Sequence, residues 1–182
     1  MDAAPTIPPT QPCLNHPRKP RIAFTLLYSL HWHFMVIAVA ADHAGFPLKQ
    51  KAIEVALELG HEVIDLGTNS TDPVDYPDYA QAAGQAVRSG LADRAILLCG
   101  SGIGACVAAN KLHGVRAGTC HDTFSAHQGV EDDDMNVLCL GARIIGPLLV
   151  PELIKSYLGA QFSGAERHLR RLRKVEALEN AG

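Results

Sequence analysis

A glycine-rich segment that starts with a cysteine is the part of the sequence best suited to chemistry. Cys99 ends an apolar run, and Gly100, Gly102 and Gly104 alternate with other residues before a stretch of small residues. Glycine adopts backbone conformations that other residues avoid, so the amide N–H groups of such a turn can surround an anion. A helix that begins after the turn adds the positive end of its dipole. We expect this turn to hold a phosphate or a reaction oxyanion, beside a Cys99 thiol that is favoured as a thiolate.

Two other interpretations fit this segment. A glycine-rich turn between a strand and a helix is also a common packing device, and a cysteine at the end of an apolar strand is often an inert buried residue. A dinucleotide-binding turn is the second alternative, with Asp122 as the acid that binds the ribose. The glycine spacing is G-x-G-x-G and not G-x-G-x-x-G, and the turn follows a strand in the middle of the chain. Both features argue against a dinucleotide.

The elements that must position this turn alternate regularly from residue 35 onward. Apolar runs typical of buried strands cover residues 36–41, 62–66, 95–98, 115–119 and 137–140. Segments with helical patterns cover residues 47–60, 78–88, 105–111, 123–130, 148–158 and 165–178. This alternation predicts an α/β fold: a single doubly wound domain with a five-stranded parallel sheet and helices on both faces.

Ligands of such sheets bind at the carboxyl ends of the strands. The groups that follow the five expected strands should therefore surround one site: Asp42 and His43, residues 67–77, residues 99–104, His121 and Asp122, and residues 141–143.

Composition excludes several classes of protein. The 182 residues, 47% of them hydrophobic, suit one well-packed domain. The net charge of −3 carries no signature of nucleic-acid binding, and the apolar run at residues 22–30 is shorter than the roughly 20 residues of a membrane span. The five cysteines are odd in number and lack C-x-x-C spacing, which indicates a reducing, cytoplasmic compartment without disulfides or a zinc site. We expect no metal, nucleic-acid or membrane partner.

Residues 1–34 differ from the rest of the chain. The first 20 are rich in proline and polar residues, a composition typical of disorder. A basic cluster at residues 18–21 and the apolar run after it imitate a signal peptide, but cleavage near residues 38–40 would destroy the first strand. We expect residues 1–34 to be a disordered extension without catalytic residues, added by a misplaced start codon in preference to serving as a targeting segment. Residues 35–182 are expected to form the catalytic domain, with a helical tail.

Several motifs in a fixed order resemble one enzyme family. They are A-D-H-A-G-F at residues 41–46, D-Y-P at 75–77, C-G-S-G-x-G at 99–104, A-N-K at 109–111, N-V-L at 136–138, G-A-R at 141–143, and R-H at 167–168 with Arg171. This set resembles the type B ribose-5-phosphate isomerases and the related galactose-6-phosphate isomerase subunits, from residue 35 to about residue 179. The resemblance implies a Rossmann-like aldose–ketose isomerase of the pentose phosphate pathway that needs no cofactor, with ribose 5-phosphate as the default substrate.

The resemblance implies a base and a set of oxyanion donors. Cys99 matches the base that moves a proton between C1 and C2 of the open-chain sugar. The Ser101 hydroxyl and the amides of Gly100, Gly102 and Gly104 match the groups that stabilise the enediolate. Some relatives place a glutamate base where this chain has Ala105, and alanine cannot take that role.

The resemblance also implies the groups that hold the substrate. His43, a further catalytic candidate, binds phosphate together with Arg143, Arg167 and Arg171. Arginine suits a phosphate dianion because its guanidinium donates two parallel hydrogen bonds. Asp42 is expected to position His43 or to contact sugar hydroxyls, and Tyr76 to line the sugar pocket. Without the resemblance, the tail would be read as a solvated amphipathic helix. In the family its arginines complete the site of a neighbouring subunit, which implies a homodimer or homotetramer.

One departure from the family pattern affects the substrate. Many relatives carry His-Asn where this chain has Asp132 and Asp133. That histidine opens the furanose ring and that asparagine holds the substrate. We expect Asp133 to bind sugar hydroxyls, but an aspartate is a poor general acid near neutral pH. His121, His127 and His43 are alternatives for ring opening, and the acidic run is otherwise a solvated loop.

The substrate and the class of activity therefore stay open at this point. Besides ribose 5-phosphate, a tetrose phosphate that is already open-chain or a hexose 6-phosphate fits the pattern. A protein that binds a sugar phosphate without turnover is the alternative from a different class.

Overall fold

The strands form one sheet in the computed structural model, which describes residues 33–181. They are β1 (Val36–Ala41), β2 (Glu62–Asp65), β3 (Arg94–Cys99), β4 (Ala117–Thr119) and β5 (Val137–Gly141). Their order is β2-β1-β3-β5-β4, and every neighbouring pair is parallel. The extension expected over residues 1–34 falls almost wholly on residues 1–32, which lie outside the described residues.

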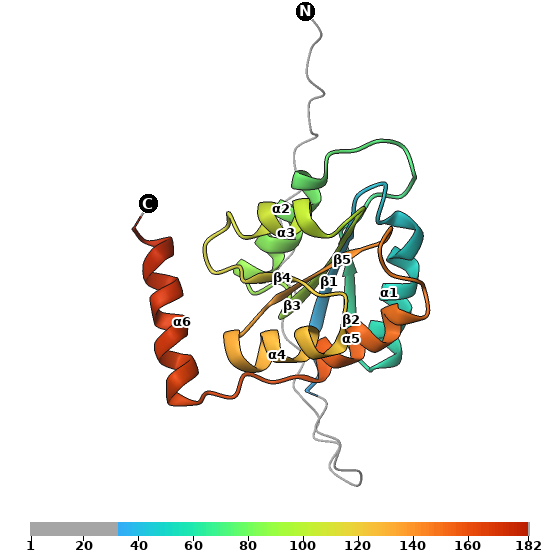
Figure 1. Ribbon diagram of the computed structural model, residues 1–182. Coiled ribbons are helices and arrows are strands. Elements are labelled where there is room, and N and C mark those ends of the chain that lie inside the picture. The colour runs from blue at the N-terminus through green and yellow to red at the C-terminus, as the bar shows by residue number, and fades with distance from the viewer. Residues whose placement is uncertain (1–32, 182) are drawn as a thin grey trace, which may run out of the picture. The chain divides into compact units, whose positions relative to one another are not determined.

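Helices cover both faces of the sheet, as the sequence pattern predicts (Figure 1). They are α1 (Phe46–Glu58), α2 (Tyr76–Arg88), α3 (Ile103–Ala109), α4 (Thr123–Asp133), α5 (Leu149–Gly159) and α6 (Glu166–Glu179). Helices α1, α4 and α5 share a core with one face, and α2 and α3 share a core with the other. The expected fold class is therefore confirmed. None of the helices within residues 33–181 is long and apolar enough to span a membrane.

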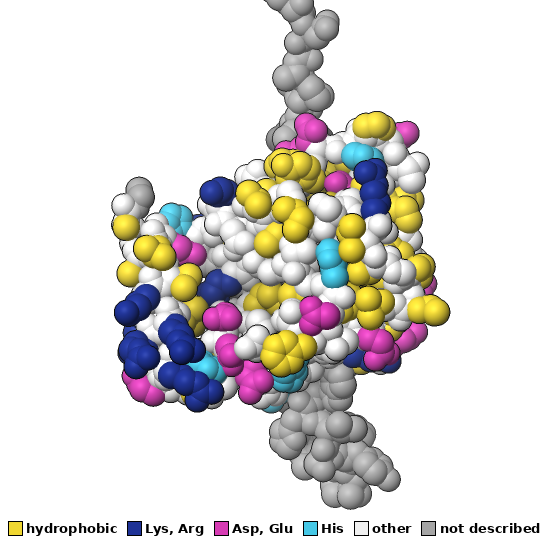
Figure 2. Space-filling model, viewed as in Figure 1, with side chains coloured by type: hydrophobic (Ala, Val, Ile, Leu, Met, Phe, Trp, Pro, Cys, Tyr) yellow, Lys and Arg dark blue, Asp and Glu magenta, His cyan; other side chains and the backbone are white. Residues whose placement is uncertain are grey.

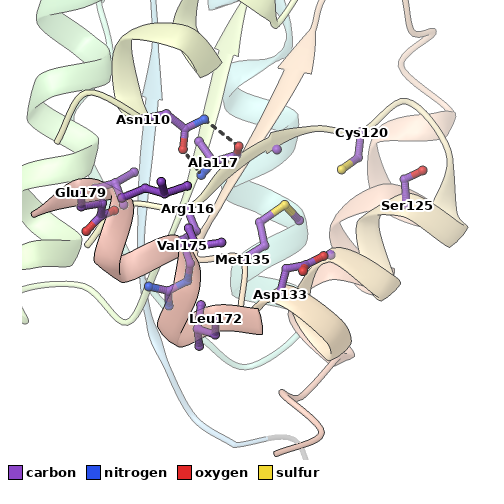
Figure 3. A pocket seen from close by; sticks show the side chains of 14 residues that line it. Asn110, Arg116, Ala117, Cys120, Ser125, Asp133, Met135, Leu172, Val175 and Glu179 are labelled. Atoms are coloured by element: carbon purple, nitrogen blue, oxygen red, sulfur yellow. Dashed lines mark hydrogen bonds between the residues drawn. The ribbon is translucent and has the colours of Figure 1, made fainter. Parts of the chain in front are cut away.

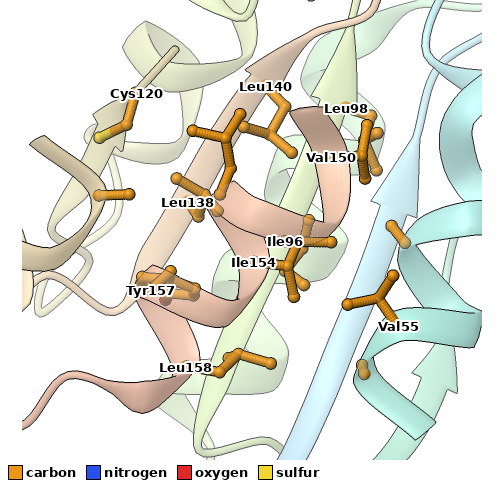
Figure 4. Packing of buried hydrophobic residues seen from close by; sticks show 14 of the residues in the cluster. Val55, Ile96, Leu98, Cys120, Leu138, Leu140, Val150, Ile154, Tyr157 and Leu158 are labelled. Atoms are coloured by element: carbon orange, nitrogen blue, oxygen red, sulfur yellow. The ribbon is translucent and has the colours of Figure 1, made fainter. Parts of the chain in front are cut away.

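The two cores differ in the size of their side chains. On one face, large residues of β3 and β5 such as Ile96 and Leu140 pack against Ile154 and Tyr157 of α5 (Figure 4). On the other face, alanines of α2 and α3 cover the sheet. Successive side chains of a strand point to opposite faces, so Leu98 enters the first core and Cys99 the second. This alternation brings the Cys99 sulfur to the side of the sheet where α3 begins.

Strand β4 is shorter than expected, and helix α6 stands apart from most of the sheet. Strand β4 begins at Ala117, two residues later than expected, because the N–H of Arg116 donates to the side chain of Asn136 (2.8 Å). Helix α6 lies beside α4 and β4, away from the rest of the sheet (Figure 1). Among the described residues of α6, His168 is the buried one. The helix therefore presents most of its surface outward.

Candidate active site

A cavity of about 390 Å³ opens at the carboxyl edge of the sheet, next to β1 and β3. The chain continues from β1 to β2 on one side of this pair, and from β3 to β4 on the other side. Sheets of this kind bind ligands at such a switch point. Most of the expected site residues meet there. The lining residues are Asp42, His43, Ala44, Tyr76, Cys99, Gly100, Ser101, Gly104, Arg143 and Ile144.

The glycine turn holds the sulfur of Cys99 in this cavity. Strand β3 ends at Cys99, and the amide N–H of Gly102 donates to its Sγ at 3.1 Å. Gly102 has φ of 82°, a left-handed conformation that favours glycine. A Cβ there would lie 2.9 Å from the side chain of Thr119 and 3.2 Å from the backbone of Gly141. Glycine is therefore required both for the backbone angle and for the close approach of β4 and β5.

Ser101 and Tyr76 also line the cavity. The Ser101 side chain is exposed, and its Oγ accepts a hydrogen bond from the N–H of Ile103 at 3.3 Å. Tyr76 begins α2, and its ring lies over Gly104, where an added Cβ would be 3.0 Å from the ring. The absence of a side chain at Gly104 thus allows Tyr76 to form a wall of the cavity.

Asp42 and His43 occupy the turn between β1 and α1. Asp42 is 5% exposed, and its Oδ1 accepts hydrogen bonds from the N–H groups of Ala44 (2.9 Å) and Gly45 (2.8 Å). Nδ1 of His43 lies 3.1 Å from the carbonyl oxygen and 3.2 Å from the nitrogen of Val74. The loop before α2 therefore orients the imidazole, while Asp42 shapes the turn. Because Nδ1 of His43 faces Val74, Nε2 is the ring nitrogen that remains for a ligand in the cavity.

Arg143 brings positive charge to the glycine turn. The backbone N–H of Arg143 donates to the carbonyl oxygen of Gly100 at 3.0 Å, and this hydrogen bond fixes the backbone after β5. Its Nη1 would lie 3.6 Å from a Cβ built on Gly100, so the guanidinium covers the turn. The Arg143 side chain is exposed. A cation above a concave turn with N–H donors is suited to a phosphate or another anion.

Three predicted site residues lie elsewhere in the chain. Asp133 lines a second cavity, of about 620 Å³, between α6 and the segment from β4 to α4 (Figure 3). Arg167 and Arg171 are exposed on α6, and neither lines the Cys99 cavity. Within one chain, Asp133 therefore does not line the Cys99 cavity, and its expected role in binding the sugar stays a prediction. The physical reason is the course of the chain, since α4 ends at Asp133 on the side of the sheet that faces α6.

The groups considered for ring opening are held in three different ways. Oδ1 of Asp132 lies 3.2 Å from Nδ1 of His168, away from the Cys99 cavity. Nε2 of His121 accepts the N–H of Gly141 at 3.0 Å, and His127 pairs with Glu131 on the exposed side of α4 at 3.2 Å. Of the histidines within residues 33–181, His43 is the one that lines the Cys99 cavity.

A second thiol lies near the Cys99 cavity, and no motif in the sequence points to it. Cys106, on α3, is half-buried, and a hydrogen bond from the thiol of Cys139 is the main cause that lowers its pKa to about 6. Burial opposes this shift, and hydrogen bonds from Thr119 and Asn110 add to it. Burial raises the pKa of Cys120 to about 11. The sequence gives little sign of this lowered pKa, because the pKa depends on how α3 packs against two neighbouring strands.

Comparisons with known proteins agree with this geometry. The family model described as Ribose/Galactose Isomerase matches residues 37–175. Ribose-5-phosphate isomerase B of Escherichia coli is 42% identical over 143 residues, 79% of this chain and 95% of that protein. D-erythrulose-4-phosphate isomerase of Pectobacterium atrosepticum is 42% identical over 130 residues, 70% of this chain and 85% of that protein.

Solved structures of type B ribose-5-phosphate isomerases also resemble this chain. Type B ribose 5-phosphate isomerase of Trypanosoma brucei superposes with a TM-score of 0.78 at 41% identity, covering 80% of this chain and 99% of that chain. Ribose-5-phosphate isomerase B of Mycoplasma genitalium, solved with bound ribulose 5-phosphate, gives 0.77 at 35% identity, covering 84% and 100%. The chain therefore belongs to the ribose/galactose isomerase family, a family of sugar-phosphate aldose–ketose isomerases.

Proposed function

We propose that the protein interconverts ribose 5-phosphate and ribulose 5-phosphate in the Cys99 cavity, with Cys99 as the base. One observation carries this proposal: a thiol, a glycine turn, an imidazole and a guanidinium line a single cavity at the switch point of the sheet. These are the groups that proton transfer next to a carbonyl and binding of a phosphate require. The names of the relatives support the substrate.

Ring opening is the first step for a pentose phosphate, and we assign it to His43. The imidazole takes the proton of the C1 hydroxyl at Nε2, the bond between C1 and the ring oxygen breaks, and the ring oxygen accepts a proton. The contact of Nδ1 with Val74 keeps the ring in one orientation during this exchange. A positioned imidazole contributes about 10²–10⁴-fold to such a step.

Proton transfer follows at the open chain. The Cys99 thiolate removes the proton from C2, the electron pair moves toward O1, and an enediolate forms. The thiol then returns its proton to C1, while the O2 proton passes to O1 and leaves a ketone at C2. The turn amides and the Ser101 hydroxyl donate to the oxyanion, and each such donor is worth about 3 kcal/mol.

The site is completed, we propose, by a second copy of the chain in a homodimer. Ile103 and Val107 of α3 are 57% and 56% exposed, directly after the glycine turn. The 620 Å³ cavity between α6 and β4 is lined by apolar residues that include Met135, Leu172 and Val175 (Figure 3). Insertion of the α3 edge of one copy into this cavity of the other buries both surfaces.

This arrangement places the tail of one copy at the glycine turn of the other. Helix α3 starts next to Ser101, and Asp133 and α6 border the cavity that would receive it. Lys and Arg side chains gather on α6, and hydrophobic side chains lie exposed over α3 (Figure 2). Arg167 and Arg171 would then join Arg143 at the phosphate, and Asp133 would reach the sugar.

A tetrose phosphate is the second candidate substrate, and one contact favours it. Both oxygens of the Asp132 carboxylate already have partners, Oδ1 with His168 and Oδ2 with Gln128 (3.0 Å), and an aspartate is a poor ring-opening acid near neutral pH. A substrate that cannot cyclise needs no such group. A relative named D-erythrulose-4-phosphate isomerase belongs to the same set of matches.

Conversion of aldose to ketose with ribose 5-phosphate, a tetrose 4-phosphate and a hexose 6-phosphate tests the proposal. We expect the highest kcat/KM for ribose 5-phosphate. A higher value for the tetrose phosphate would establish the second candidate. Binding of these sugars without turnover would make the protein a non-catalytic binder and contradict the proposal.

Complementation tests the shared site. A mixture of Cys99→Ala and Arg171→Ala proteins, after verified exchange of subunits, should recover part of the activity that each variant lacks. The absence of recovery would show that each tail serves its own chain.

A further inference from the structure

A contact between a half-buried aspartate of α4 and a buried histidine of α6 plays no part in the chemistry proposed above. His168, in the first turn of α6, is 2% exposed. Its Nδ1 lies 3.2 Å from Oδ1 of Asp132 and 2.8 Å from Oγ of Ser163. Both partners meet the same ring nitrogen, whereas a catalytic triad uses one nitrogen for the serine and the other for the acid. The arrangement therefore holds segments together and does not activate a nucleophile.

The Asp132 carboxylate is also held by a contact within its own helix. Its Oδ2 accepts a hydrogen bond from Nε2 of Gln128, one turn earlier in α4, at 3.0 Å. The linker before α6 is tied at the same place, because the N–H of Ser163 donates to the carbonyl oxygen of Glu131 at 3.0 Å. A carboxylate held in this way gives a well-oriented acceptor for an N–H on His168.

The remaining attachments of α6 are weak by comparison. At its far end, Oε2 of Glu179 accepts the N–H of Gly114 at 3.0 Å in an exposed contact. The cavity of about 620 Å³ separates the middle of α6 from β4 (Figure 3). Exposed polar contacts add little to stability, so the buried end at His168 determines where the helix lies.

We propose that Asp132 is a positioning residue for the phosphate site: by holding His168, it fixes the first turn of α6 and with it Arg167 and Arg171. The inference rests on the proposed phosphate role of these arginines. Arg167 precedes His168 directly and Arg171 follows it by three residues, so both lie within about one helical turn of the contact. Where many relatives carry a ring-opening histidine, this chain carries the residue that orients its phosphate-binding helix.

Steady-state kinetics of the full-length protein with ribose 5-phosphate test this role. Asp132→Ala should raise KM about tenfold, the worth of one charge-assisted hydrogen bond, while kcat stays within about threefold. Combining Asp132→Ala with Arg171→Ala should raise KM by less than the product of the two separate effects, because Asp132→Ala displaces the contact that Arg171→Ala removes and only the displacement of Arg167 is added. Glu131→Gln is the matched control: it removes a neighbouring negative charge whose side chain pairs with the exposed His127.

Hydrogen exchange gives a readout that does not depend on activity. Amides of α6 should exchange about tenfold faster in Asp132→Ala than in the parent, whereas those of α1 should not change. Glu131→Gln should leave both unchanged. Asp132→Asn, which keeps the shape of the side chain and loses its charge, should shift KM and exchange in the same direction by less. It also supplies the test if the alanine variant fails to fold.

Different results would contradict the positioning role of Asp132 and the phosphate role of the tail arginines. Unchanged exchange in α6 would overturn the positioning role of Asp132. A drop in kcat with KM unchanged, or effects that add fully with Arg171→Ala, would assign Asp132 to the chemistry and also overturn it. If Arg171→Ala itself leaves KM unchanged, the phosphate role of the tail is wrong, and the exchange data then decide alone whether Asp132 holds α6.

Discussion

The amide N–H of Gly102 donates to the sulfur of Cys99 across 3.1 Å, and this contact joins the end of a strand to the start of a helix. It depends on the left-handed φ of 82° at Gly102, which turns the N–H back toward β3. The sulfur consequently stays at the bottom of the cavity that Arg143 covers. The Cys99 thiol, the amide N–H groups of the turn and the Arg143 guanidinium thus share one short turn and the strands next to it.

The turn after β1 depends on the absence of a side chain at Gly45. A Cβ at this position would collide with the carbonyl oxygen of Leu98 in the central strand. Gly45→Ala should therefore lower the free energy of unfolding by about 3 kcal/mol, measured by urea denaturation. Gly146→Ala is the control, because a Cβ there meets nothing within 4 Å. Equal stability of the two variants would show that the turn can shift at no cost.

Arg143 should contribute to substrate binding more than to turnover. Arg143→Gln removes the guanidinium above Gly100, and we expect KM to rise at least about tenfold for every phosphorylated sugar that the enzyme uses, because the phosphate is common to all. Arg88→Gln, which changes an exposed arginine in the last turn of α2, should leave KM unchanged. A rise in KM confined to one sugar would place Arg143 at the sugar hydroxyls instead.

Cys106 should react as a thiolate near neutral pH. With its pKa lowered to about 6, the deprotonated form predominates at pH 7 and is lost as the pH falls below 6. Mass spectrometry of peptides after brief treatment with iodoacetamide should therefore show labelling of Cys106 with a midpoint near pH 6. Cys120, with its pKa raised to about 11, should remain unlabelled at pH 7. A midpoint for Cys106 near pH 9 would contradict the hydrogen bonding described around its sulfur.

Local sequence patterns were enough to predict the sheet and most of the Cys99 cavity. Strands β1, β3 and β5 are short apolar runs buried on both faces, and the polar residues that follow parallel strands must meet at one edge. That rule placed Asp42, Cys99 and Arg143 together without knowledge of any contact. Each of these residues lies within two residues of the end of a strand, so its position depends mainly on the course of the sheet.

The positions of Asp133 and the tail could not be predicted in the same way. Helix α6 follows the last strand by a whole helix and a linker, and one of its contacts with α4 joins Asp132 to His168, 36 residues apart in the sequence. The low pKa of Cys106 likewise depends on side chains from β4, β5 and α3 that no short motif connects. Such contacts are products of tertiary packing.

The turnover of Cys99→Ala with ribose 5-phosphate tests the central claim most directly. The comparison uses the parent and Cys106→Ser, which changes a neighbouring thiol outside the cavity, with circular dichroism to confirm equal folding. We predict that kcat of Cys99→Ala falls at least about 10²-fold, the contribution of a positioned base, while Cys106→Ser keeps the activity of the parent. A folded Cys99→Ala protein with kcat within about tenfold of the parent would contradict the assignment of Cys99 as the base.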